Sequence, residues 1–346
     1  MADLPDGDVF DDESIDDDLL DDELPDDELV AGVRSGDRRA LARAITLVES
    51  SRPDHRDHAR TVLEALLPAT GGSMRIGVSG APGVGKSTFI EALGLYLVEA
   101  GHRVAVLAVD PSSSRTGGSI LGDKTRMADL ARHPHAFIRP SPGGTHLGGV
   151  ARRTREAMLL CEAFGFDVVI VETIGVGQSE VAVADMVDLF LLLVAPGGGD
   201  ELQGIKRGIM ELADLVVVNK ADGDLAAAAG RTAADYANAL HLVRPRWSTW
   251  TARARSCSAL QHTGIAEVWQ EVEDFAEMIG ASGEDTVHRA GQAVAWMWSE
   301  VRDTLADRLR ADPAVAALVP GLEADVAAGR VTPSTAAARL LDAFAG

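Results

Sequence analysis

Long apolar runs, cysteines and basic tracts are scarce in this chain of 346 residues. No apolar run reaches the roughly 18 residues that a membrane-spanning helix needs, so we expect no membrane association. The two cysteines, Cys161 and Cys257, are too few for a disulfide framework, which favours a reducing cytoplasmic location. A basic patch with interleaved aromatic residues is missing, which argues against a nucleic-acid partner.

Basic residues are also absent from the first 28 positions, which hold fifteen acidic residues. This composition is the reverse of a signal or transit peptide. Because the segment has few apolar side chains to bury, we expect residues 1–28 to form a disordered acidic tail. The formal net charge is −21, and without those fifteen acids it is −6, so the remainder is only mildly acidic.

The rest of the chain, in a sequence that is 46% hydrophobic, can bury a full α/β core. Helix-like segments separate five strand-like runs: Met74–Ser79, Arg103–Val109, Asp167–Glu172, Asp188–Ala195 and Asp214–Asn219. This alternation predicts an α/β fold with a mostly parallel sheet and helices on both faces, within residues 71–282.

Helical patterns flank this predicted domain on both sides. Residues 29–70 are expected to form an N-terminal segment of two helices that break near Ser51-Arg52-Pro53. Residues 283–346 are expected to form a C-terminal helical extension, with shorter helices split at Pro320-Gly321 and Thr332-Pro333. The extension carries an apolar stripe at spacings of three and four: Val294, Trp298, Val301, Leu305 and Leu309. Such a stripe packs either within the monomer or against a second copy.

A phosphate-binding loop follows the first strand-like run. The pattern G-x-x-x-x-G-K-[ST] is formed by Gly80, Ala81, Pro82, Gly83, Val84, Gly85, Lys86 and Ser87. Its glycines allow backbone N–H groups to surround a phosphate, and the following helix directs its positive end at the anion. We expect Lys86 to contact the β- and γ-phosphates, Ser87 to ligate Mg²⁺ and Thr88 to reach the α-phosphate.

A second pattern identifies guanine as the base. The strand-like run Asp214–Val218 leads into Asn219, Lys220, Ala221 and Asp222, which form the N-K-x-D pattern. The Asp222 carboxylate can accept from the two donors of guanine, whereas adenine would leave this charge unpaired. Ser258 and Ala259 lie where a second base-contacting loop is expected.

Acidic residues at the ends of other strand-like runs predict the metal site. Asp110 and Glu172 lie at the carboxyl edge of the sheet, where phosphates and metal gather. We expect Ser87, Asp110, Asp123 and Glu172 to organise Mg²⁺, with Lys86, Glu172 and Asp123 as the catalytic set. Gly175 is expected to donate its backbone N–H to the γ-phosphate. Val176 follows, where Ras-like proteins carry a water-orienting Gln, so hydrolysis without a partner should be slow.

Four longer runs resemble the MeaB/ArgK family, whose members include the bacterial counterparts of the human methylmalonic aciduria type A protein. These runs are Val106–Ser113, Gly118–Met127, Glu172–Glu180 and Gly199–Lys206. The resemblance implies a P-loop GTPase of the metallochaperone-related group. It further implies a homodimer, with 283–346 as its dimerisation segment, which gates adenosylcobalamin loading and protects methylmalonyl-CoA mutase. The family's switch III would then map onto Gly197–Lys206, with Asp200 and Lys206 as its charged contacts.

Two other functions stay open. Proteins of this family were also named transport-system kinases for lysine, arginine and ornithine uptake, which implies phosphoryl transfer to a binding protein. The third candidate is a nickel-delivery GTPase. It would ordinarily carry Cys/His ligand clusters, whereas Cys161 and Cys257 are far apart and His133-Pro134-His135 stands alone.

Overall fold

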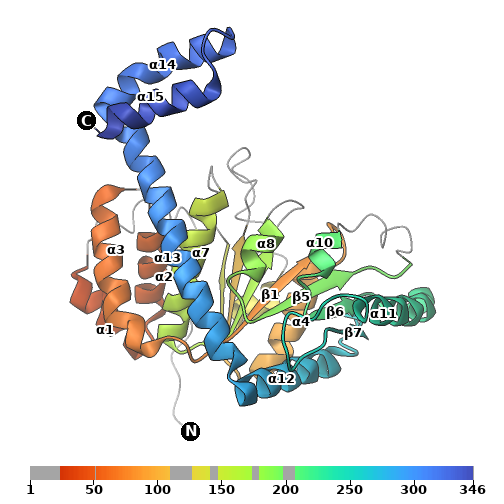
Figure 1. The fold of residues 1–346 in the computed structure, drawn as a ribbon. Coiled ribbons are helices and arrows are strands. Elements are labelled where there is room, and N and C mark those ends of the chain that lie inside the picture. Colours follow the sequence, from red (N-terminus) through yellow and green to blue (C-terminus); the bar gives the residue numbers. More distant parts are fainter. Residues whose placement is uncertain are drawn as a thin grey trace. The chain divides into compact units, whose positions relative to one another are not determined.

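The computed structural model describes residues 24–50, 52–109, 127–140, 147–173, 179–197 and 207–345 (Figure 1). The chain divides into two compact units, Met1–Asp285 and Thr286–Gly346, and the division falls in the first turn of helix α13 (Glu284–Ala311). Among the described residues, no helix is long and apolar enough to cross a membrane.

A parallel sheet of seven strands forms the centre of the first unit, in the order β3-β2-β4-β1-β5-β6-β7. The strands are β1 (Met74–Gly80), β2 (Val104–Val109), β3 (Ala136–Arg139), β4 (Val168–Thr173), β5 (Leu189–Val194), β6 (Leu215–Val218) and β7 (Arg253–Ser256). The predicted fold class is confirmed. The edge strands β3 and β7 were not predicted, because their side chains alternate in burial or are exposed and the strands lack the continuous apolar run of a buried strand.

Helices cover both faces of this sheet. The helices of the first unit that follow strands are α4 (Lys86–Glu99), α6 (Ala128–Arg132), α7 (Leu147–Phe164), α8 (Ser179–Ala184), α10 (Arg207–Met210), α11 (Ala226–Leu240) and α12 (Ile265–Ser282), with the 3-10 turn η3 (Gly223–Leu225) before α11. Helices α4, α6 and α12 share one buried apolar core with inward side chains of the strands. On the opposite face, a Cβ added at Gly77 of β1 would lie 2.9 Å from Val183 of α8, so this position accepts only glycine.

Three N-terminal helices precede the sheet: α1 (Asp26–Ser35), α2 (Arg38–Glu49) and α3 (Pro53–Leu66), followed by the turn η1 (Leu67–Ala69). The sequence pattern predicted two helices here. The extra break lies at Gly36, whose φ of 84° is a left-handed helix end, and Asp37 then caps α2 by accepting from Arg39 N at 2.8 Å. Helix α1 also begins at Asp26, inside the expected tail, because acidic side chains are favourable in a first turn.

The second unit consists of most of α13 with α14 (Pro313–Ala327) and α15 (Pro333–Ala345), which pack on each other. Pro320 lies inside α14, so the predicted split at Pro320-Gly321 is wrong. On α13 the stripe residues Val294, Trp298 and Leu305 are all more than half exposed.

A buried ion pair ties α7 to the first strand of the sheet. Arg75 donates from Nε and Nη2 to the two carboxylate oxygens of Glu162, at 2.7 and 2.9 Å. Glu162 also accepts from Ser73 Oγ at 2.5 Å and from Gly71 N at 2.8 Å. Burial raises the pKa of Glu162, but these hydrogen bonds and the charge of Arg75 outweigh it, so the pKa lies below its usual value.

Replacing Glu162 should therefore destabilise the first unit strongly. Glu162→Ala leaves the Arg75 guanidinium buried and uncompensated, and we expect a loss of about 3–5 kcal/mol in the free energy of unfolding, measured by urea titration. Because the folded pKa of Glu162 is depressed, its contribution is present above the ordinary pKa and is lost as the pH falls through the lowered value. The difference between wild type and variant should shrink at acid pH.

Asp57→Ala is the matched control, because Asp57 forms an exposed ion pair with Arg60 at 3.0 Å. Its effect should stay within about 0.5 kcal/mol. A Glu162→Ala protein as stable as this control would show that the buried pair contributes nothing.

Candidate nucleotide-binding site

The phosphate loop connects β1 to α4 at the carboxyl edge of the sheet. Val84 is buried and anchors the loop to the core, whereas Ala81, Pro82 and Gly83 are exposed. Lys86 Nζ donates to the carbonyl of Gly80 at 2.8 Å, which holds the ammonium group over the loop. The exposed loop and the first turn of α4 thus present backbone N–H groups and one cation to an incoming phosphate.

Gly85 is required by two independent constraints. Its φ of 93° lies in the left-handed region, which side chains rarely adopt. A Cβ at this position would also lie 2.8 Å from Nδ2 of Asn219, so the phosphate loop and the base loop approach each other closely here.

Ser87 and Glu172 form the described part of the predicted metal site. Ser87 Oγ donates to Glu172 Oε1 at 3.3 Å, and Glu172 is 3% exposed at the end of β4. A hydroxyl and a carboxylate are the hard oxygen donors that Mg²⁺ prefers, so this pair fits the ion. Elsewhere in the described part of the chain no group of three or more His, Cys, Asp or Glu could hold a metal.

Two carboxylates act on the charge of Lys86. Burial lowers the pKa of Lys86, and the negative charges of Glu172 and Glu180 partly offset this effect. Glu180 lies in the first turn of α8 and is 3% exposed. Glu180 was not predicted as a site residue, because no pattern in the sequence distinguishes it from an ordinary acid in a first helical turn.

The side chain of Asn219 joins the two loops. Its Nδ2 donates to Val84 O at 3.0 Å and to Gly85 O at 3.4 Å, and its Oδ1 accepts from Ala259 N at 3.1 Å. The thiol of Cys257 also lies 3.7 Å from Oδ1. Asn219 is 2% exposed, so all its partners are protein groups in a low-dielectric environment, where such bonds are strongest.

Lys220 and Asp222 are the residues of the base loop that are expected to contact the base. Lys220 Nζ donates to Gly83 O at 2.7 Å. The backbone of Lys220 has a φ of 59°, in the left-handed region, which turns the chain back. Ser258 Oγ donates to Asp222 Oδ2 and accepts from Gln261 N at 3.1 Å. Ser258 thus orients the carboxylate that is expected to recognise guanine.

Of the remaining predicted site residues, only Thr88 lies within the described part of the chain. Thr88 is exposed in the first turn of α4, where the sequence analysis expected an α-phosphate contact. Asp110, Asp123, Gly175, Asp200 and Lys206 lie outside the described residues. One link that the sequence analysis missed is a buried bond from Thr173 Oγ1 to Ser79 Oγ, at 2.9 Å, which joins the ends of β4 and β1.

Comparison with known proteins gives consistent matches over most of the chain. A putative GTPase of Caulobacter vibrioides is 61% identical over 310 residues, covering 90% of this chain and 95% of that protein. The mitochondrial methylmalonic aciduria type A homolog of Mus musculus is 48% identical, covering 91% of this chain and 79% of its own length. A crystal structure described as a LAO/AO transport system kinase is 40% identical, with a TM-score of 0.73, over 93% of this chain and 98% of that one.

The family model of the methylmalonyl Co-A mutase-associated GTPase MeaB matches residues 41–314. This match spans the phosphate loop, the base loop and the start of the second unit. It confirms the resemblance drawn from the sequence and the assignment of the chain as a P-loop GTPase. The chain belongs to the MeaB family of methylmalonyl Co-A mutase-associated GTPases.

Proposed function

We propose that the protein hydrolyses GTP to GDP and phosphate, with Mg²⁺, and couples this cycle to a partner, an adenosylcobalamin-dependent methylmalonyl-CoA mutase. In this function it gates the loading of adenosylcobalamin and protects the mutase from inactivation. The proposal that the protein binds and hydrolyses GTP is supported by the Asn219 side chain, which bridges the phosphate loop and the base loop. The partner rests on family membership and on the name of the mouse relative.

The described residues divide the chemistry between them. Lys86 and the loop N–H groups stabilise charge on the phosphates, and Glu172 orients the attacking water or a water in the metal shell. Ser87 and Glu172, with Asp110 and Asp123, would hold Mg²⁺, which neutralises charge on the phosphate oxygens when it is bound. The exposed stripe on α13 would form the homodimer contact.

The base preference is testable. Guanine offers two donors to Asp222 and adenine offers none, so GTP should bind at least about 100-fold more tightly than ATP. Asp222→Asn should shift the preference toward xanthine nucleotides, whose extra carbonyl requires a donor. Calorimetric titration with each nucleotide measures both effects.

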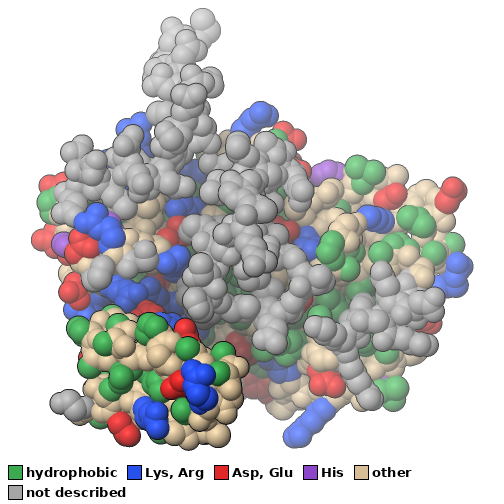
Figure 2. Space-filling view, turned by 90° about the horizontal axis from the view of Figure 1, so that it is seen from above, with side chains coloured by type: hydrophobic (Ala, Val, Ile, Leu, Met, Phe, Trp, Pro, Cys, Tyr) green, Lys and Arg blue, Asp and Glu red, His purple; other side chains and the backbone are tan. Residues whose placement is uncertain are grey.

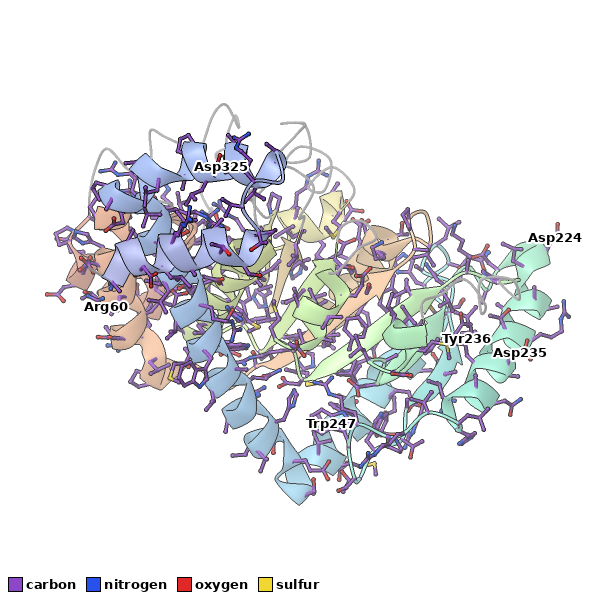
Figure 3. All side chains as sticks on the ribbon, turned by 45° about the horizontal axis from the view of Figure 1, so that its top comes forward. Arg60, Asp224, Asp235, Tyr236, Trp247 and Asp325 are labelled. Atoms are coloured by element: carbon purple, nitrogen blue, oxygen red, sulfur yellow. The ribbon has the colours of Figure 1, made fainter. Side chains whose placement is uncertain are left out.

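Asp224→Asn is the control for this experiment, because Asp224 is exposed on η3 two residues beyond Asp222 (Figure 3). It should keep the wild-type preference. Equal affinities for GTP and ATP in the wild type would remove the guanine assignment and favour the transport-system kinase, which would transfer phosphate to a protein.

The role of Glu172 predicts a separation of binding from turnover. Glu172→Ala removes the carboxylate beside Ser87 but no group assigned to the base or to the phosphate loop amides. We expect nucleotide affinity to change little, while turnover at saturating GTP falls by about 100-fold. Single-turnover phosphate release measures this rate. Wild-type turnover in the variant would exclude Glu172 from the catalytic set.

The partner should raise a slow basal rate. With Val176 where a water-orienting Gln would be expected, the isolated protein should turn over far below the roughly 1–100 s⁻¹ of activated phosphoryl-transfer enzymes. Binding of the mutase should raise this rate, and by reciprocity the GTP and GDP forms should differ in mutase affinity. Asp200→Ala and Lys206→Ala should weaken the coupling and spare basal hydrolysis.

GTP turnover with and without purified mutase from the same organism is the measurement. The comparison requires a mutase that binds the protein and is able to take up its cofactor. If turnover and nucleotide affinity are then unchanged, the chaperone function is wrong and the GTPase remains.

A further inference from the structure

A half-buried group of charged side chains lies where the end of β3, an edge strand, meets α2, α3 and α7. We name it the arginine cluster. It comprises Arg56 at the start of α3, Arg139 at the end of β3 and Arg152 and Arg153 on α7, together with Glu49 of α2 and Glu156 of α7. None of these residues belongs to the nucleotide site described above.

Four guanidinium groups in this cluster face two carboxylates. Arg139 Nη2 donates to Glu49 Oε2 at 2.6 Å and to Thr46 Oγ1 at 3.3 Å. Arg152 Nη1 lies 4.0 Å from Glu156 Oε1, at the outer limit of an ion pair. The Arg139 and Arg152 side chains are each only 17% exposed. Solvent therefore screens the charges of Arg139 and Arg152 incompletely.

Two donors within the cluster have no acceptor. The Nε atoms of Arg139 and Arg153 are buried, and neither has a hydrogen-bond partner. A buried unsatisfied donor carries the full cost of its desolvation, and the cost rises when the group is charged. Burial lowers the pKa of Arg153, and the positive charges of Arg152 and Arg56 lower it further. The carboxylates of Glu49 and Glu156 offset part of this shift. An anion among these groups would relieve both costs.

The position of the cluster separates it from the nucleotide phosphates. Arg139 ends β3, so the cluster lies toward the same carboxyl edge of the sheet as the phosphate loop. The strand order places β2 and β4 between β3 and β1, and three strand spacings amount to about 14 Å. In Figure 2, which views this edge from above, Lys and Arg side chains gather on the side that holds α2, α3 and α7.

We propose that the arginine cluster is a second anion site, which binds a phosphate-bearing ligand separate from the nucleotide. Arginine presents a planar fork of donors that matches phosphate oxygens in pairs. The oxygens of a phosphate can also accept from the buried Nε donors of Arg139 and Arg153. A purely structural role, in which the arginines only join α2, α3 and α7, predicts no anion binding.

The probe for this site is inorganic pyrophosphate, titrated calorimetrically into the full chain saturated with GDP. GDP fills the α- and β-phosphate positions of the phosphate loop, so the remaining binding reports the arginine cluster. We expect one pyrophosphate per chain. Arg153→Gln should weaken binding about tenfold or more, the usual effect of removing a charge-assisted hydrogen bond.

Two further variants keep the test independent of folding. Arg153→Lys retains the charge but not the planar fork, so it should bind pyrophosphate more weakly than wild type and more tightly than Arg153→Gln. Glu156→Gln removes a competing carboxylate and should strengthen binding. A structural network would instead lose stability in Glu156→Gln with no gain in affinity.

Arg60→Gln is the matched control on α3. Arg60 is 67% exposed, pairs with Asp57 and lies outside the arginine cluster (Figure 3). Its pyrophosphate affinity should equal that of wild type at the same ionic strength. The site is excluded if GDP-saturated wild type binds no pyrophosphate, or if Arg60→Gln weakens binding as much as Arg153→Gln. These outcomes leave the GTPase function untouched.

Discussion

The amide of Asn219 is the contact on which the rest of the nucleotide site depends. One side chain donates to the phosphate loop and accepts from the turn that carries Ala259, so the two halves of the site have a fixed separation. The close approach has a structural consequence at Gly85, where a Cβ would collide with that amide. The phosphate loop and the base loop are therefore held together through a buried side chain.

The parallel sheet explains why residues distant in sequence meet here. Every strand delivers its following segment to the same edge, and the strand order puts β4 and β5 on either side of β1. Ser87 therefore reaches Glu172 of β4, and Thr173 reaches Ser79 of β1. The residues expected to recognise the base follow β6 and β7, one and two strands beyond β5. Two side chains of the base loop contact the phosphate loop, the buried amide of Asn219 and the ammonium group of Lys220.

The sequence predicted the parts of this site that depend on local backbone geometry. Glycine and lysine spacing specified the phosphate loop, and a buried strand before N-K-x-D specified the base loop. It did not predict β3 and β7, whose edge positions remove the continuous apolar run, nor the helix end at Gly36. Glu180 and the arginine cluster were missed for another reason, since their environment is produced by helices packing from distant segments and no local pattern records it.

The distribution of charge in the first unit follows from the same topology. Glu172 and Glu180, the acids that act on Lys86, lie near the end of β1, where the nucleotide phosphates are expected to bind. The positive charge of Lys86 would offset the negative charge of the acids and of the phosphates. The arginine cluster lies instead at the end of β3, the edge strand of the described sheet. The guanidinium group of Arg75, on the central strand β1, is buried and paired with Glu162, whereas the Nε atoms of Arg139 and Arg153 are buried without a partner. The edge of the sheet is thus where this fold can accommodate a second charged ligand without disturbing the nucleotide.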